Sequence, residues 1–246
     1  MLTRKDGSLD VTRLSAITDQ IADLRRRGEQ VVMVSSGAVA SGRSELRAIV
    51  DTRLDNVSER QLYSAVGQAK LINRYYELFR EHDLHCAQVL ATKESFRNSE
   101  HYANMSNALE TMLAAGVIPI VNENDTVSID ELMFTDNDEL SGLIATIIHA
   151  DRLIMLSNIN GLYTGAPDAE GSELIRTVAV TDDPSAYICS TRSSAGRGGM
   201  GSKCKVARQI AASGIPVTIA NGKRDDILEA VCFGATDVPC TRFITQ

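Results

Sequence analysis

The chain has 246 residues, 43% of them hydrophobic, and a formal net charge of −7 at pH 7. This length and apolar content are enough for a full hydrophobic core, while the negative charge argues against a nucleic acid or an anionic membrane surface as partner. No apolar stretch is long enough to cross a bilayer, and the first residues lack the apolar core of a signal peptide, so we expect a cytoplasmic protein. The five cysteines are odd in number and widely spaced, which favours reduced thiols over a disulfide framework or a structural zinc site.

Apolar residues alternate between helical and strand-like spacing along the chain. The first expected element is an amphipathic helix over 11–24 that stops at Gly28, preceded by a turn-like segment where such folds usually open with a strand. The other expected elements are helices at 59–80, 99–115, 138–149 and 200–212, strands at 30–34, 84–91, 117–121, 152–156 and 215–220, and a β-hairpin at 126–135. This alternation predicts the α/β class, as a doubly wound three-layer sandwich with a mostly parallel central sheet. Because no linker or repeat interrupts it, we expect a single domain over 1–246.

Small and hydroxylated residues follow the first expected strand. Ligands of doubly wound sheets collect beyond the carboxyl ends of the strands, and here Ser35, Ser36 and Gly37 lie at such an end, just before a helix. Glycine lets a ligand approach the backbone, and the exposed N–H groups favour an anion. The segment is not the nucleophile elbow of a hydrolase, because Val34 replaces its first glycine. A serine N-cap on a tightly packed helix is the alternative explanation.

Two polar clusters bracket the expected hairpin, at 122–125 (NEND) and 136–139 (DNDE). Asp136 with Glu139 three residues later is a plausible capping box for the helix that follows. Capping accounts for one or two acids, whereas the other carboxylates and amides would be costly at a buried strand end unless a ligand or metal satisfied them. Acids suit an ammonium group and amides suit carboxylates, so the two clusters together suit a zwitterion.

A glycine-rich loop precedes the helix expected at 200–212. It spells G-x-G-x-x-G, but no strand precedes it and no acid closes the following strand, which argues against a dinucleotide site. It also misses the Walker A pattern, because Ser202 separates Gly201 from Lys203. A flexible glycine loop with a lysine at a helix start cradles phosphate oxygens, so the segment predicts a phosphate site.

These segments together resemble the glutamate 5-kinases of the amino acid kinase superfamily, nearly end to end. The matching segments are VSSGAVASGR, QLYSAVGQAKL, IPIVNENDTVS, FTDNDELSGLIA, LSNINGLYT and GRGGMGSK. The Asn-Glu-Asn-Asp and Ser-Ser-Gly-Ala segments are the specific part, because acetylglutamate and uridylate kinases carry glycine-rich segments at Ser35 and Ser36. The resemblance implies phosphoryl transfer from MgATP to the γ-carboxylate of L-glutamate, the first step of proline biosynthesis. It also implies an N-terminal part that binds the acceptor and a nucleotide-binding part at about 150–246.

The resemblance carries roles to individual residues. Lys203 would stabilise the transferred phosphoryl group, with Asp138 and Asp136 orienting it or binding the waters of Mg2+. The residues implied for glutamate are Ser36, Asp125 and Asn137, supported by Asn122 and Gly37. Those implied for ATP are Ser157, Asn158, Arg197, Gly198, Gly199, Met200, Gly201, Ser202 and Lys203.

The chain departs from the family pattern in three places. The lysine of the family's first strand has no counterpart, and the sequence looks as if it begins just after that strand. Asn158 stands where many relatives have aspartate. The RNA-modification-type domain that many relatives carry at the C-terminus is absent, as in short-form members.

Two alternatives stay open. One is a non-catalytic amino-acid or nucleotide sensor on the same fold, favoured by the missing lysine and opposed by Lys203 and both polar clusters. The other is a sibling kinase of another carboxylate or phosphate. The resemblance further implies feedback inhibition by proline, a homo-oligomer (dimer or tetramer), and glutamyl phosphate reductase as the downstream enzyme.

Overall fold

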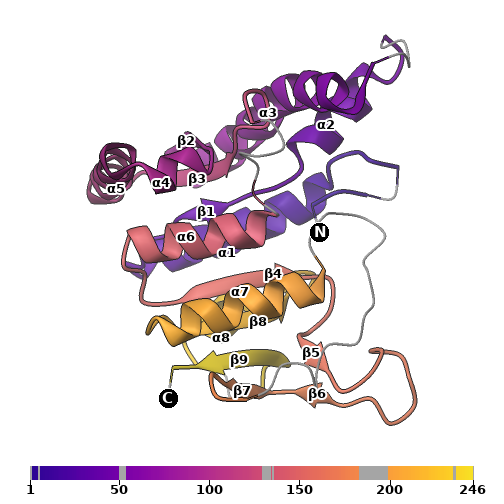
Figure 1. Cartoon of the computed structure of the whole chain (residues 1–246), viewed down its shortest axis with the longest axis vertical. Helices are drawn as coiled ribbons and strands as arrows, with labels where there is room; N and C mark the ends of the chain where they lie inside the picture. Colours follow the sequence, from indigo (N-terminus) through magenta and orange to yellow (C-terminus); the bar gives the residue numbers. More distant parts are fainter. Residues whose placement is uncertain are drawn as a thin grey trace. The chain divides into compact units, whose positions relative to one another are not determined.

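The computed structural model describes residues 2–4, 6–49, 54–128, 134, 136–182, 199–234 and 237–245. Contacts between Cα atoms divide the chain into two compact units, Met1–Phe134 and Thr135–Gln246, which we describe separately (Figure 1). No helix among the described residues has both the length and the apolar character needed to span a bilayer.

The first unit is built on a three-stranded parallel sheet. Its helices are α1 (Val11–Arg26), α2 (Ala38–Leu46), α3 (Asn56–Arg80), α4 (Glu94–Arg97) and α5 (Ser99–Ala114), and its strands are β1 (Met33–Val34), β2 (Cys86–Ala91) and β3 (Ile118–Glu123). The strand order is β1-β3-β2. Central β3 is buried along its whole length, and α5 packs against it while α3 packs against β2.

Side-chain caps and glycines set the helix boundaries of this unit. Asp10 accepts a hydrogen bond from the Arg13 N–H at the start of α1, and Asp55 accepts two at the start of α3. These carboxylates satisfy N–H groups that have no partner inside the helix. Gly28, with φ of +90°, follows the end of α1, as its position in the sequence predicted.

Two glycines let α2 and α3 cross at very short range. A Cβ on Gly42 would lie 1.9 Å from the Tyr63 carbonyl oxygen, and one on Gly67 would lie 1.8 Å from the Ala38 carbonyl oxygen. Both clashes are with backbone atoms, so any side chain would force the helices apart. This crossing fixes the start of α2, and with it the Ser36-Gly37 loop, against the middle of α3.

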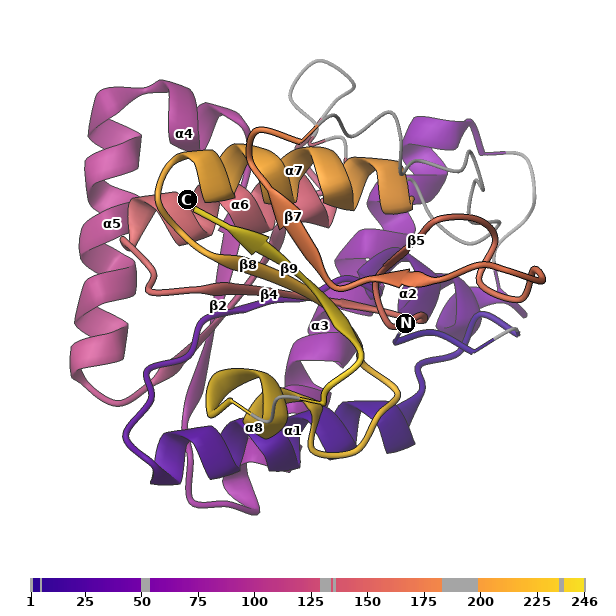
Figure 2. The same cartoon turned by 90° about the horizontal axis from the view of Figure 1, so that it is seen from below.

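The second unit contains a mixed four-stranded sheet and a small hairpin. Its elements are α6 (Asn137–Ile147), β4 (Leu153–Ser157), β5 (Leu162–Tyr163), β6 (Leu174–Ile175), β7 (Thr177–Ala179), α7 (Met200–Ala212), β8 (Val217–Asn221), α8 (Ile227–Cys232) and β9 (Cys240–Ile244). The sheet order is β4-β8-β9-β7, with β8 and β9 antiparallel and the other two pairs parallel. Helices α6 and α7 lie side by side on one face and α8 on the other (Figure 2). The core between α7 and the sheet includes Met155, Cys204, Val217, Ile219 and Phe243.

The α/β class and the mostly parallel pairing are confirmed, and α7 has the predicted bounds. Several boundaries differ from the prediction, among them the start of α3 at Asn56 and the start of β2 at Cys86. Strand β1 pairs over only two of the residues at 30–34, whereas β3 runs beyond 121 into Asn122 and Glu123, because the parallel ladder with β2 continues to Ala91. Helix α2, expected directly after Gly37, runs from Ala38 to Leu46.

The N-terminal segment and the expected hairpin are described only in part. The N-terminal residues form a single antiparallel bridge, Thr3 to Leu9, before α1. Of the hairpin expected at 126–135, residues 129–133 and 135 lie outside the described part, and the described part begins as a turn in which the Asn124 carbonyl accepts from the N–H groups of Val127 and Ser128. The single domain stays a prediction.

Candidate active site

The loop after β1 presents one of its two serines to solvent. Ser35 is 2% exposed; its N–H donates to the Val121 carbonyl (3.0 Å) and its hydroxyl shares a 2.8 Å hydrogen bond with the Tyr75 hydroxyl. Burial raises the pKa of Tyr75 to about 12, so this phenol stays neutral. Ser36 is exposed, and Gly37 has a φ of +110° that favours glycine. Ser36 is therefore the serine available to a ligand, and Ser35 holds the loop.

Asn122 is held by a glutamine of α3. Its amide nitrogen donates to Gln68 Oε1 at 2.8 Å, and both side chains are buried. Because a buried amide is costly without a partner, this bond fixes the orientation of Asn122 at the end of β3. The pairing supports the sequence interpretation of Asn122 as a supporting residue.

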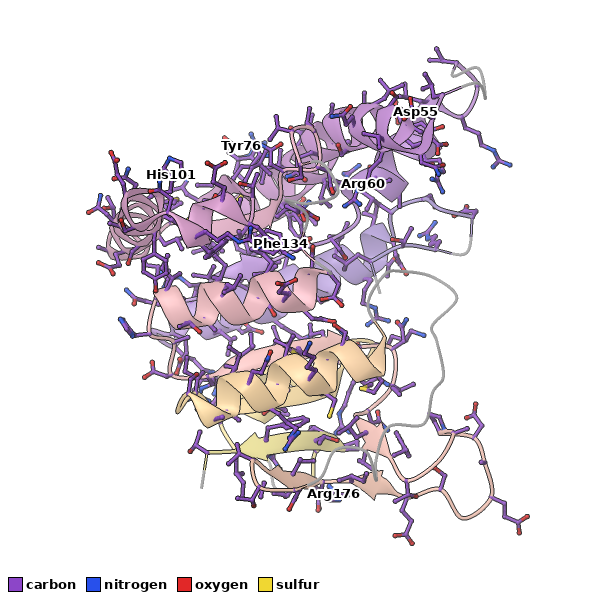
Figure 3. The ribbon with its side chains drawn as sticks, viewed as in Figure 1. Asp55, Arg60, Tyr76, His101, Phe134 and Arg176 are labelled. Carbon is purple, nitrogen blue, oxygen red and sulfur yellow. The ribbon has the colours of Figure 1, made fainter. Side chains whose placement is uncertain are left out.

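Two buried carboxylates at the end of β3 share one arginine. Arg60 Nε donates to Asp125 Oδ1 at 2.9 Å, and Arg60 NH2 contacts both that oxygen and Glu123 Oε2, the latter at 3.2 Å. Glu123 Oε1 accepts from the Phe134 N–H at 2.8 Å. Figure 3 labels Arg60 on α3 and Phe134 at the end of the first unit. The side chain of Phe134 packs edge-on against Phe96, with ring centroids 5.8 Å apart.

A cavity of about 320 Å³ opens at this end of the first unit. Its polar lining comes from α3, from β2 and from the end of β3, and includes Gln68, Gln88, Glu123, Asn124 and Asp125. Its apolar lining consists of alanines from α2 and α3 and of Leu90 from β2. A volume of this kind with convergent carboxylate and amide groups suits a small amino acid.

In the second unit, the starts of α6 and α7 are joined through side chains. Asp136 caps α6: its Oδ1 accepts from the N–H groups of Asp138 and Glu139 at 3.0 and 3.1 Å, and its Oδ2 accepts from the Ser202 hydroxyl. Lys203 Nζ donates to Asp138 Oδ1. Burial raises the pKa of Asp138, and the charge of Lys203 opposes that shift. The predicted helix cap is therefore real, and Asp136 has a second bond beyond it.

Close helix packing brings these residues together. A Cβ on Gly142 would lie 2.9 Å from Val206 Cγ1 and 3.1 Å from Ile210 Cδ1, so glycine is what allows α6 and α7 to approach. Both helices lead through short turns into the strands they cover, so they start at the edge where β4 and β8 end. Lys203 and Asp138 lie at that edge.

The nucleotide residues implied by the resemblance lie at the same edge as far as the structure describes them. Ser157 ends β4 and pairs in register with Asn221 of β8, and Asn158 follows it, exposed. Gly199 precedes α7 and has no side chain with which to cap it, and the first N–H groups of a helix have no partner inside the helix. Arg197 and Gly198 lie outside the described residues.

The predicted site residues divide between the units. Ser36, Gly37, Asn122 and Asp125, proposed for glutamate, belong to the first unit. Asn137, also proposed for glutamate, opens α6 in the second unit, between Asp136 and Asp138. Across the described parts of the chain, no three His, Cys, Asp or Glu side chains gather into a group that could hold a metal ion.

Sequence reasoning missed two residues of the first unit, Arg60 and Gln68. A signal for them exists: together with Ser64 they lie four residues apart on α3 and form a polar stripe on one face of a long amphipathic helix. Polar residues spaced in this way next to an apolar face indicate partners inside the protein. In the second unit Asn160 was also missed; its side-chain oxygen accepts from Asn221 at 3.1 Å.

Comparison with known proteins shows the family to which the chain belongs. The family model described as "Amino acid kinase family" matches residues 2–221. A protein named glutamate 5-kinase from Bacteroides thetaiotaomicron is 58% identical over 244 residues, which cover 99% of this chain and 67% of that protein. Proteins of the same name from Chlorobaculum tepidum (43% identical, 100% of this chain, 67% of the relative) and Symbiobacterium thermophilum (41%, 95% and 88%) are also similar. The chain thus spans about two thirds of the length of the first two.

Solved structures share the fold at low identity. A crystal structure of an isopentenyl phosphate kinase substrate complex superposes with a TM-score of 0.67 and 14% identity, covering 96% of this chain and 92% of that one. Carbamate kinase from Giardia lamblia bound to AMP-PNP gives the same TM-score and identity, with 96% and 89% covered. The match of the family model over most of the sequence and the identity to the Bacteroides protein lead to one assignment: the chain belongs to the amino acid kinase family, in the branch of the glutamate 5-kinases.

Proposed function

We propose that the chain transfers the γ-phosphoryl group of ATP to the γ-carboxylate of L-glutamate, forming L-glutamyl 5-phosphate and ADP as the first step of proline biosynthesis. The observation that carries this proposal is the 58% identity to a glutamate 5-kinase over 99% of the chain. The geometry adds an acceptor cavity with carboxylates and amides in the first unit, and a paired lysine at a helix start in the second. The identity to named glutamate 5-kinases outweighs the missing lysine that favours the sensor, and it also favours this acceptor over that of a sibling kinase.

The chemistry makes modest demands on the protein. A γ-carboxylate with a pKa of about 4.3 is already ionised at neutral pH, so attack on the γ-phosphorus requires no general base. One carboxylate oxygen forms the new P–O bond as the bond between that phosphorus and the leaving oxygen of ADP breaks. The barrier is electrostatic, since an anion approaches a polyanion, and positioning with positive charge lowers it. We assign that charge to Lys203, oriented by Asp138.

We propose that Asp125 binds the ammonium group of glutamate, while Ser36, Gly37, Asn122 and Asn137 hold or support its carboxylates. Asp125 lines the cavity, and Asn122 donates a hydrogen bond to Gln68, which also lines it. An ammonium group in a cavity with buried carboxylates replaces hydration that burial removes.

We propose that ATP lies at the start of α7, against Gly199, Met200, Gly201 and Ser202, with Ser157, Asn158, Arg197 and Gly198 completing the site. Uncapped N–H groups at a helix start bind phosphate oxygens. Mg2+ would reach the site mainly through the nucleotide phosphates and waters, because Mg2+ needs only one or two protein carboxylates. Asp136 and Asp138 are the carboxylates that we assign to this role. Both lie at the start of α6, where they contact side chains of α7.

We also propose a cytoplasmic homo-oligomer, dimer or tetramer, that is inhibited by proline and passes its product to a glutamyl phosphate reductase. These proposals rest on the family alone. An acyl phosphate is labile, so an enzyme that reduces it must act soon after it forms.

The test is the reaction itself. We expect ADP release that depends on L-glutamate and Mg2+, and trapping of the product by hydroxylamine as the γ-hydroxamate. D-glutamate and L-aspartate are the matched control acceptors. ATP hydrolysis without trapped hydroxamate, or equal activity with an unrelated carboxylate, would contradict the proposal.

A further inference from the structure

Arg60 forms a bridge between two acids that end the central strand of the first unit. Its guanidinium binds Asp125 through Nε and NH2 and Glu123 through NH2. The side chains of Glu123 and Asp125 are 5% and 9% exposed, and that of Arg60 is 20% exposed. Such charge-assisted bonds are strong and directional, because the planar guanidinium presents its N–H groups in a fixed fork.

The two acids have different bonding. Both oxygens of Glu123 are occupied, Oε1 by the Phe134 N–H and Oε2 by Arg60. Asp125 receives Arg60 on Oδ1, and its Oδ2 has no hydrogen-bond partner among the described residues. Among the described residues, Oδ2 is not one of the fully buried polar atoms that lack a partner, and Asp125 lines the cavity, so Oδ2 is the oxygen of this pair that can accept a hydrogen bond from a ligand there.

Arg60 contacts residues that line the cavity but is not itself part of the lining. Asp125 and Glu123 line it, together with Gln68 and Asn124, whereas Arg60 is outside its lining within the described chain. Without a cation next to them, two neighbouring buried carboxylates would repel each other and repel a carboxylate of the ligand. Arg60 supplies that cation without occupying the space in which a ligand would lie.

We propose that Arg60 is a positioning residue for the acceptor: it fixes Asp125 so that Oδ2 receives the α-ammonium group, and it neutralises Glu123 so that the ligand's carboxylates can enter. This inference rests on the proposed glutamate kinase function and deepens it. In this proposal, the protein distinguishes an α-amino acid from the matching dicarboxylate with the help of Arg60, although Arg60 itself does not contact the ligand.

The test is a double-mutant cycle on glutamate binding, measured by titration calorimetry on the full chain. Arg60→Met is expected to weaken glutamate binding by roughly tenfold or more, because it leaves Asp125 without its buried partner. In an Asp125→Asn background the same change is expected to weaken binding clearly less than in the wild type, because the contribution through Asp125 is gone and only the neutralisation of Glu123 remains. Arg60→Lys should lie between, because lysine keeps the charge and loses the fork.

A second readout is the preference for glutamate over glutarate, which lacks the ammonium group. The wild-type chain should discriminate strongly, and Arg60→Met should lose most of that discrimination, which a general loss of structure would not produce selectively. Arg74→Met is the matched control, because Arg74 lies on the same helix with an exposed ion pair to Glu77. If Arg60→Met does not fold, as judged by thermal unfolding, Arg60→Lys carries the cycle.

Equal losses from Arg60→Met with and without Asp125 would overturn the inference, and would indicate direct contact of Arg60 with the ligand. Unchanged discrimination against glutarate in Arg60→Met and Arg60→Lys would overturn it as well. Failure of the proposed function is distinct: a wild-type chain that does not bind glutamate, or binds it without forming glutamyl phosphate under full assay conditions, rejects the kinase assignment before any variant is made.

Discussion

Lys203 and Asp138 form an ion pair between the first turns of two neighbouring helices, and both side chains are largely buried, with 19% and 13% exposed. The pair places a positive charge at the edge where β4 and β8 end. A lysine held there by a carboxylate points in a defined direction, which a free lysine at a loop would not.

Replacing Lys203 by methionine should remove most of the catalytic rate. We expect kcat to fall by about 10²- to 10³-fold, because one preorganised charge facing the transferred group is lost. Lys205→Met is the control, since Lys205 lies on the same helix and is exposed. Initial rates of hydroxamate formation measure both. Similar rates for the two variants would show that Lys203 does not act on the transferred phosphoryl group.

The pH dependence should report Asp138. Burial raises its pKa above the usual 3.8, against the opposing charge of Lys203. The ionised form holds the lysine, so kcat should fall as the pH drops through this raised pKa. The contribution of Asp138 to stability changes with pH in the opposite direction. A carboxyl group whose pKa rises on folding destabilises the folded state when it is ionised, so this contribution to the free energy of unfolding improves as the pH falls. Profiles of kcat from about pH 4 to about pH 8 should lose their acid limb in Asp138→Asn. A limb that persists there belongs to another group.

The two serines after β1 should separate by experiment. Ser35→Ala removes a buried hydrogen bond to Tyr75 and should lower the free energy of unfolding by about 1 kcal/mol with little effect on the KM for glutamate. Ser36→Ala should leave stability unchanged and raise that KM, since Ser36 is exposed and proposed to contact the substrate. Denaturant unfolding and initial-rate kinetics of both variants decide the matter, and the reverse pattern would assign the substrate contact to Ser35.

Alanine at the close-packed glycines should give graded losses of stability. Gly67→Ala should cost about 2–4 kcal/mol, because the new Cβ meets a backbone oxygen that cannot move alone. Gly142→Ala should cost about 1–2 kcal/mol, since its nearest atoms are side-chain ends. Gly165→Ala is the control, with an expected change within about 0.5 kcal/mol, because its nearest contact is an ordinary 3.5 Å. Equal losses at all three positions would rule out the packing explanation.

Sequence patterns predicted the long helices and the central strands well, because their apolar periodicity reflects a buried face, but they missed the short helices α4 and α8. They failed where the cause is not local. Strand β9 was not predicted and is defined by its antiparallel ladder with β8, and the three-residue strand β7 is defined by its pairing with β9. Short strands of this kind depend on partners that no sequence window contains.

Residue types and spacing also predicted which polar segments matter, but not how charge is balanced within them. Acids at 123 and 125 were visible in the sequence, whereas their cation comes from Arg60, more than sixty positions earlier. The capping role of Asp136 could be predicted because capping acts within one turn, while its bond to Ser202 requires two helices to pack. Local chemistry was therefore predictable, and pairing across elements was not.

The contact at Gly142 has a consequence for the timing of order in this protein. Because α6 and α7 pack closely there and Asp138 holds Lys203, the packing of the two helices itself restricts the conformations of the lysine side chain. The phosphates of a nucleotide then compete with Asp138 for Lys203. A bulkier residue at position 142 would push the helices apart and leave Lys203 free to move. ATP would then have to order this side chain on binding, so its affinity should fall, although residue 142 does not contact the nucleotide.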